Sequence, residues 1–219
     1  MMTDNLDIVE APNRSTRHKL KTRAKLIAAA LTVMSKKGAD AATINDITET
    51  ADVGFGSFYN HFKSKEDILE AAANELFEKL GAQIDAQIES IADPCVALAT
   101  GVRVFTTIMI AKMEWARFLI RLSSARGYSK YGIYARLFRD IQRVHDSKRL
   151  QFPDPQIAAY AVGGAILFMT SAMVEGDIPE VDAPQRIAAM MLRMLGEKED
   201  EIQAIVSLPL PNRASELLG

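Results

Sequence analysis

The chain has 219 residues, of which 48% are apolar, enough for one large or two modest domains with a buried core. Its formal net charge of −2 excludes a uniformly basic nucleic-acid-binding protein. The single cysteine, Cys95, excludes a framework of internal disulfides and fits a reducing cytosol. Residues 1–13 contain three acids and no apolar core, so they predict a disordered arm rather than a signal peptide.

Positive charge is concentrated near the N-terminus. Between Arg14 and Lys65 there are ten lysines and arginines against four acids, a local charge of +6, so the rest of the chain carries −8. A basic head on an acidic body indicates a protein that meets DNA with one end only. The first helix is predicted over Thr16–Lys37, with Gly38 ending it. Its apolar stripe is expected to consist of Leu20, Ala24, Ile27, Leu31 and Met34, and its basic face to contact phosphate through Arg17 and Lys19.

A helix-turn-helix is predicted between Thr43 and Lys65. Thr43 is a helix N-cap, and Asp46 three residues later gives a start that resembles a capping box. The pattern breaks at Gly54, which can adopt backbone angles that other residues resist and so suits a tight turn between helices.

A second short helix is expected over about 55–61. Phe58 and Phe62 lie four residues apart on its inner face and are expected to pack on the helices before it. The opposite face contains no acid, and most of its side chains are small or able to form hydrogen bonds. It is made of Phe55, Gly56, Ser57, Tyr59, Asn60 and His61. Such a surface can approach a DNA duplex.

The stretch Ala51–Glu66, A-D-V-G-F-G-S-F-Y-N-H-F-K-S-K-E, is followed by an apolar helix and resembles the TetR family of bacterial transcriptional regulators. The resemblance covers about residues 16–70. It implies an all-α fold, with an N-terminal three-helix helix-turn-helix DNA-binding domain and a larger helical domain for ligand binding and dimerisation. One departure is Gly54, where the family usually places Ser or Thr, so a hydroxyl able to touch phosphate is missing.

The resemblance also implies roles for individual residues of the DNA-binding domain. Four match family positions that hold phosphates: Thr43, Tyr59, His61 and Lys65. Four others match positions that approach base edges: Asn45, Phe55, Gly56 and Ser57. The chemistry agrees, because Lys65 lies in the first turn of its helix and Phe55 is able to contact a thymine methyl group. Without an arginine placed for guanine, specificity is expected to depend on apolar contacts and DNA shape.

The remainder of the chain is predicted to be helical throughout. Ser64, with Asp67, caps a long helix whose apolar stripe runs to Ile91 and in which Gly81 marks a bend. Asp93-Pro94 and Asp154-Pro155 open two further helices by N-cap and N1 proline chemistry. The other expected helices cover 113–125, 129–147, 182–195 and 197–206. The expected domains are a helix-turn-helix domain at 14–66, an effector-binding and dimerisation domain at 67–206 and a tail at 207–219.

The larger domain is expected to bind a small molecule. Aromatic and flexible apolar side chains are typical of such sites, although the same pattern also occurs in an ordinary core. The candidate lining residues are Phe105, Met109, Met113, Trp115, Phe118, Arg121 and Phe168. The apolar helix at 155–174 and the helix at 182–195 are the expected homodimer interface, because small residues in the first permit close helix approach. A buried helix is favoured over a membrane span there.

Together these features predict a cytoplasmic, ligand-responsive transcriptional regulator. The expected partners are a palindromic operator and a small, largely apolar effector that releases a repressor from DNA. One alternative is a DNA-binding protein of the same fold without an effector, either an architectural factor or an activator, and another is a small-molecule-binding protein with a vestigial DNA head. The three histidines have no metal spacing, and phosphate-loop and serine-hydrolase motifs are absent from the sequence. Neither an enzyme, a metal site nor a cofactor is expected.

Overall fold

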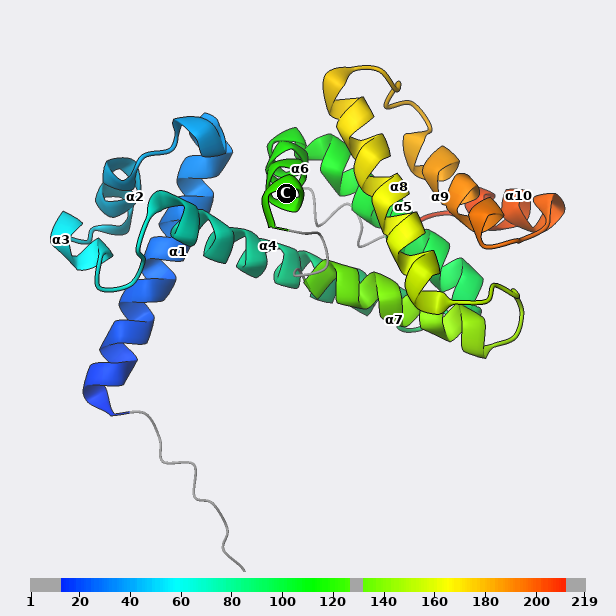
Figure 1. The fold of residues 1–219 in the computed structure, drawn as a ribbon, viewed down its shortest axis with the longest axis horizontal. Helices are drawn as coiled ribbons and strands as arrows, with labels where there is room; N and C mark the ends of the chain where they lie inside the picture. The colour runs from blue at the N-terminus through cyan, green and yellow to red at the C-terminus, as the bar shows by residue number, and fades with distance from the viewer. Residues whose placement is uncertain (1–12, 127–131, 212–219) are drawn as a thin grey trace, which may run out of the picture. The chain divides into compact units, whose positions relative to one another are not determined.

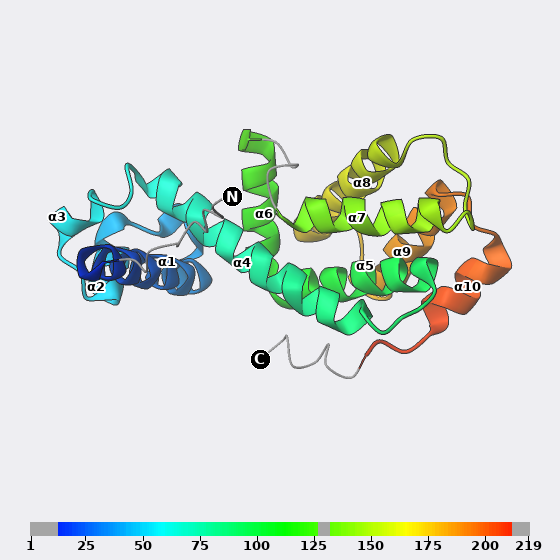
Figure 2. The ribbon, with the colours of Figure 1, turned by 90° about the horizontal axis from the view of Figure 1, so that it is seen from below.

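The computed structural model describes residues 13–126 and 132–211, and these residues form α-helices and connecting turns without a strand (Figures 1 and 2). The predicted all-α class is confirmed. The chain divides into two compact units, Met1–Ala72 and Ala73–Gly219. This boundary falls inside the helix α4, Lys65–Ile88, a few residues after the boundary expected from the sequence. The predicted arm at 1–13, except Asn13, and the last eight residues of the predicted tail lie outside the described residues.

The first unit is built on α1, Arg14–Ala41. The Asn13 side chain caps this helix by accepting a hydrogen bond from Thr16 N at 2.8 Å, and its regular course is interrupted at Gly38, which has a φ of 78°. Ile27 and Met34 of the expected stripe are buried, but Leu20 and Ala24 are exposed. The stripe was therefore wrong in its first half, because the helices that cover α1 pack only on the part that follows Lys25. The buried set is Leu26, Ile27, Ala29, Ala30, Val33 and Met34.

The helix-turn-helix consists of α2, Ile44–Ala51, and α3, Phe55–Phe58. The capping box of Thr43 and Asp46 is confirmed, as is the burial of Phe58 and Phe62. The turn differs from the expectation, because its left-handed residue is Asp52, with a φ of 52°, whereas Gly54 has an ordinary φ of −59°. Asp52 tolerates this conformation because its short polar side chain is one of the few that does. The helix is also shorter than expected, since tight turns replace it after Phe58.

The described part of the second unit packs five helices and the remainder of α4 around α5, Pro94–Ala111. The other helices are α6, Met113–Arg126; α7, Gly132–Asp146; α8, Pro155–Glu175; α9, Ala183–Met194; and α10, Glu199–Ser207. Most of α5 is buried, and α7, α8 and α9 surround it (Figures 1 and 2). The N-caps predicted at Asp93 and Asp154 are confirmed by hydrogen bonds from the backbone amides of Cys95 and Gln156, each 2.8 Å long.

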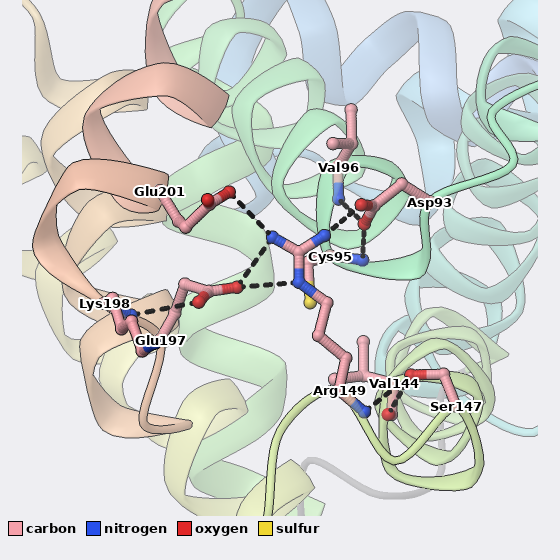
Figure 3. Close-up of polar contacts among 9 residues, drawn as sticks. All are labelled: Asp93, Cys95, Val96, Val144, Ser147, Arg149, Glu197, Lys198 and Glu201. Carbon is pink, nitrogen blue, oxygen red and sulfur yellow. Dashed lines mark hydrogen bonds and ion pairs between the residues drawn. The ribbon is translucent and has the colours of Figure 1, made fainter.

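A partly buried ion cluster joins three parts of the second unit (Figure 3). Arg149, between α7 and α8, pairs with Asp93 at the start of α5 and with Glu197 and Glu201 at α10. The carboxylate of Glu197 lies 3.0 Å from the guanidinium and only 5% of its side chain is exposed. The Cys95 thiol lies beside this cluster, and burial raises the pKa of Cys95 to about 12. The thiol is therefore an inert packing group at neutral pH.

The helix α8 is apolar on faces that the second unit does not cover. Phe168 is 77% exposed, and Ile157, Tyr160 and Gly164 lie on the same stripe. On α9, Met190 and Met194 are also exposed. Both α5 and α8 are long and apolar enough to cross a membrane. Within the protein, however, 67% of the apolar stretch of α5 is buried, and 33% of the apolar stretch of α8. An uncovered apolar surface of this kind is typical of a protein interface.

Candidate nucleic-acid interface and effector cavity

The DNA-facing candidates occupy one surface of the first unit. Phe55 and Tyr59 are 51% and 53% exposed and meet edge to face, with ring centroids 5.8 Å apart. Tyr59 also packs on the buried Phe58 at 5.3 Å, which fixes the direction of its ring. Gly56 is exposed, and a Cβ built there would have no atom within 4 Å. Ser57 is half-buried and Asn60 is exposed, so α3 presents rigid aromatic rings beside open backbone.

Three other candidates already have partners within the unit. The Thr43 hydroxyl donates to Asp46 Oδ2 at 2.8 Å and accepts from Asp46 N at 3.1 Å. Asn45 donates through Nδ2 to Glu49 at 2.7 Å, and Lys65 Nζ donates to the carbonyl of Asp40 at 2.7 Å. Lys65 keeps two further ammonium protons for a phosphate, whereas the Thr43 hydroxyl has no proton and only one lone pair left. Thr43 thus acts in this structure mainly as a helix cap.

The half-buried His61 faces the basic surface of α1. Its Nδ1 is buried and has no hydrogen-bond partner among the residues that the structure describes. Burial lowers the pKa of His61, and the charges of Lys19, Arg23 and His18 lower it further. The imidazole is therefore a neutral donor at neutral pH, not a cation. Arg23, which also lies 4.8 Å from the Phe62 ring centroid, is an additional basic candidate that the sequence reasoning missed. Its position one helical turn after Lys19 was the available signal.

The exposed start of α1 completes this basic surface. Arg17 lines a shallow hollow together with Arg14, His18 and Lys21, and Lys19 is exposed nearby. The unit therefore combines a capped helix-turn-helix, projecting aromatic rings and a cluster of cations. This arrangement defines a helix-turn-helix DNA-binding protein.

The second unit contains a partly open cavity of about 60 Å³ between α4, α5, α7 and α8. Most of its lining is apolar, including Phe105, Ile84 and Ile166, and its polar wall consists of Asp85, Arg136 and Asp140. Gly81 leaves room for the side chain of Arg136, because a Cβ at Gly81 would lie 2.6 Å from Arg136 Cδ. The helix α4 is continuous through Gly81, and the bend expected there stays a prediction. The glycine permits close approach of a side chain from α7.

The polar wall is held by ion pairs between α4 and α7. Arg136 donates through Nε to Asp85 at 2.9 Å and lies 2.9 Å from Glu78, while Arg139 donates to the other oxygen of Asp85 at 2.7 Å. Burial opposes ionisation of Asp85, but the hydrogen bonds from Arg139 and Arg136 outweigh it and lower the pKa of Asp85. Asp140 accepts from Arg139 at 2.9 and 3.0 Å, yet burial prevails and raises the pKa of Asp140.

Of the residues expected to bind an effector, only Phe105 lines this cavity. Met109 and Phe118 are buried elsewhere in the core, and Met113 and Trp115 are half-buried. Arg121 and Phe168 are exposed, so they lie outside any internal site of this unit. The sequence reasoning missed Gly81, Asp85, Arg136 and Asp140, because partners more than fifty residues apart form the wall and local periodicity does not report such pairs.

Comparison with known proteins gives the family. Residues 26–72 match the model of bacterial regulatory proteins of the tetR family, and residues 93–208 match a tetracyclin repressor-like C-terminal domain. The second match alone spans more than half of the chain. The chain therefore belongs to the TetR family of transcriptional regulators.

Similar proteins agree with this assignment. The chain is 31% identical over 72 residues to the repressor KstR2 of Mycolicibacterium smegmatis and 35% identical over 74 residues to the repressor DhaR of a Mycobacterium species. These matches cover 33% and 34% of this chain, and they span only 35% and 37% of those relatives' length. The solved structure of RolR with its ligand resorcinol is 30% identical, with a TM-score of 0.80, and covers 90% of this chain and 98% of RolR. RolR without ligand has a TM-score of 0.74 at 29% identity, and covers 86% of this chain and 98% of RolR.

Proposed function

We propose that this chain is a cytoplasmic homodimeric repressor that leaves a palindromic operator when a small hydroxylated aromatic compound enters the cavity between α4, α5, α7 and α8. The observation that carries the proposal is this cavity, which is mostly apolar with one polar wall of Asp85, Arg136 and Asp140. A ring suits the apolar lining, and the wall offers hydrogen-bond partners to its substituents. The similar protein RolR was solved with resorcinol, a single ring with two hydroxyl groups.

The charges of the wall favour a hydroxyl group over a carboxylate. Arg136 and Arg139 are both paired with acids already, and Arg143, whose charge also acts on Asp140, lines the outer hollow between α4 and α7 rather than the cavity. A carboxylate would add negative charge beside Asp85 and Asp140 without an unpaired cation among the described lining residues to balance it. Asp140 accepts its hydrogen bonds from Arg139 through Oδ1, and Oδ2 accepts none from the described residues. A phenolic O–H donating to this free oxygen would satisfy it.

Release from DNA follows from the position of the ion pairs. Glu78 and Asp85 belong to α4, whose first turns are part of the unit that contains the helix-turn-helix. An effector that forms hydrogen bonds with Asp140 and Arg136 would change the ion pairs through which α7 contacts α4. The DNA-binding state and the effector-binding state then differ in free energy, and DNA affinity falls by the effector's differential affinity and no more.

Dimerisation is proposed through the exposed apolar faces of α8 and α9, at 155–174 and 182–195 as the sequence predicts. Phe168, Ile157 and Met190 would be covered there by the same residues of a second copy, as in a two-fold interface. Two helix-turn-helix units are needed because paired units bind half-sites about one DNA turn apart.

The test is operator release by a matched pair of ligands. Fluorescence anisotropy with DNA from upstream of the protein's own gene would be measured with resorcinol and with benzoate. We expect resorcinol to release the DNA and benzoate to have no effect at the same concentration. Asp140→Asn should weaken the resorcinol response about tenfold while leaving binding to DNA alone unchanged, because a hydrogen bond to a charged group contributes about 1.5–3 kcal/mol.

Failure of both ligands, together with specific DNA binding, would reject this effector class. If a broader thermal-shift screen also found no stabilising ligand, the alternative without an effector would be favoured. DNA binding without preference for the upstream sequence would reject the operator assignment.

A further inference from the structure

The apolar side of the effector cavity includes a glycine in the middle of α5. Gly101 lines the cavity together with three larger residues of the same helix, Leu98, Val102 and Phe105. Its two neighbours in the sequence, Thr100 and Val102, are buried, whereas Gly101 is half-buried. Because Gly101 lines the cavity, its backbone borders the space that the proposed effector would occupy.

Neither the backbone nor the packing of α5 requires a glycine at this position. Gly101 lies inside a helix of 18 residues and its φ is not positive. A Cβ built at Gly101 would lie 3.5 Å from Ile84 Cγ2 and 3.8 Å from Ile88 Cδ1, which are ordinary van der Waals distances. Gly81 differs, because a Cβ there would lie 2.6 Å from Arg136 Cδ. Alanine is the strongest helix former and glycine one of the weakest, so Gly101 makes α5 less stable than alanine would.

The feature that Gly101 does provide is empty space in the cavity. Ile84 lines the cavity as well, so a methyl group in contact with Ile84 at position 101 would occupy the side of the cavity between α4 and α5. In a cavity of about 60 Å³, one methyl group removes a substantial part of the space open to a ligand. The glycine lowers the stability of α5 and leaves room for a ligand, a trade-off that is common at functional sites.

We propose that Gly101 sets the size of the effector. The aromatic ring lies against the backbone of Gly101, in the space that a side chain would fill, and its hydroxyl groups face the polar wall of Asp85, Arg136 and Asp140. The site therefore favours a single ring without further alkyl substituents. The inference rests on the proposed function, because it takes this cavity to be the effector site.

The test compares ligand affinity and protein stability in Gly101→Ala. Calorimetric titration of the full chain with resorcinol should give an affinity about tenfold lower than that of the wild type, because a filled cavity resists overpacking. Resorcinol with one added ring methyl group should bind the wild type more weakly than resorcinol does. Urea unfolding without ligand should show a higher midpoint for Gly101→Ala, and operator affinity without ligand should be unchanged.

Gly81→Ala is the contrasting variant, because its Cβ would collide with Arg136 and should lower the urea midpoint. Equal resorcinol affinity in Gly101→Ala and the wild type would overturn the inference and leave the effector class standing. A lower urea midpoint for Gly101→Ala would also overturn it, because packing would then require the glycine.

Benzene separates a failure of this inference from a failure of the proposed effector class. It has the ring without the hydroxyl groups, so it needs the space at Gly101 and not the polar wall. If NMR titration shows that the wild type binds benzene but not resorcinol, the hydroxylated effector class is rejected, and weaker benzene binding in Gly101→Ala still supports the inference. Equal benzene binding in both proteins, or a wild type that binds neither ring, would overturn it.

Discussion

At the scale of single residues, we expect the candidate DNA-facing surface to combine side chains that position DNA with side chains that recognise it. Phe55 is exposed and packs against Tyr59, and Lys19 and Lys65 carry positive charge. Contacts to phosphate fix register, and contacts to base edges give specificity. The two kinds of contact respond differently to salt, which makes their roles measurable.

Phe55→Ala should lower affinity for the operator by about 1–3 kcal/mol, the usual cost of losing one base contact. The dependence of affinity on salt should not change, because Phe55 releases no counterion. Lys65→Ala should instead reduce the slope of log affinity against log salt by about one unit, on the operator and on random DNA alike. Anisotropy titrations at several salt concentrations measure both. An equal loss for Phe55→Ala on random DNA would contradict a role in recognition.

His61 should make the first unit sensitive to acid. Burial and the charges of Lys19, Arg23 and His18 lower the pKa of His61 below its unfolded value of 6.5, so the unfolded chain takes up the proton first. Stability is therefore fully present above pH 6.5 and is lost as the pH falls from there through the lower pKa of the folded state. Urea unfolding at pH 7.5 and 5.5 should show a smaller loss for His61→Gln than for the wild type. An identical loss in both proteins would contradict this role.

At the scale of secondary-structure elements, Arg149 connects the start of α5 with the start of α10. Arg149→Met would leave the nearly buried carboxylate of Glu197 without its cation. We expect a loss of about 2–3 kcal/mol in the free energy of unfolding, the cost of an unsatisfied buried charged group. Urea denaturation measures it. Arg193→Met is the matched control, because its pair with Glu199 is fully exposed and should leave stability within error of the wild type.

The apolar stripe of α8 should control dimerisation. Phe168→Lys places a charge on the most exposed large apolar side chain of the second unit, where a dimer would have to bury it. Sedimentation velocity at micromolar concentration should show a dimer for the wild type and a monomer for the variant. Leu20→Lys, a similar change on the exposed part of α1, should remain dimeric. A wild type that sediments as a monomer would reject the interface.

At the scale of the whole molecule, the proposed effector and operator should act on each other reciprocally. If the effector lowers operator affinity by a given factor, bound operator lowers effector affinity by the same factor. Coupling of this kind is usually about 1–3 kcal/mol, or 5- to 150-fold. Calorimetric titration of resorcinol into the free protein and into its operator complex should give this factor. Equal affinities in the two titrations would mean that the ligand is not an allosteric effector.

The sequence by itself determined the features that depend on neighbouring residues. The caps at Thr43, Asp93 and Asp154, the buried pair Phe58 and Phe62, and the all-α class follow from local hydrogen bonding and from helical spacing. Even locally there were errors, since the left-handed turn residue is Asp52 and not Gly54, and only a backbone angle distinguishes the two.

Only the tertiary structure decided where the cavity lies and which residues form its polar wall. Asp85 pairs with Arg136 and Arg139, which lie 51 and 54 residues away in the sequence. The absence of a side chain at Gly81 leaves room for Arg136. In the sequence, the charged residues of this group look like part of a solvent-exposed helix face, and Gly81 looks like a residue that weakens its helix. Their roles arise because packing of α4 against α7 brings charges of opposite sign together beside an apolar space, and a periodic pattern within one helix carries no information about its partner.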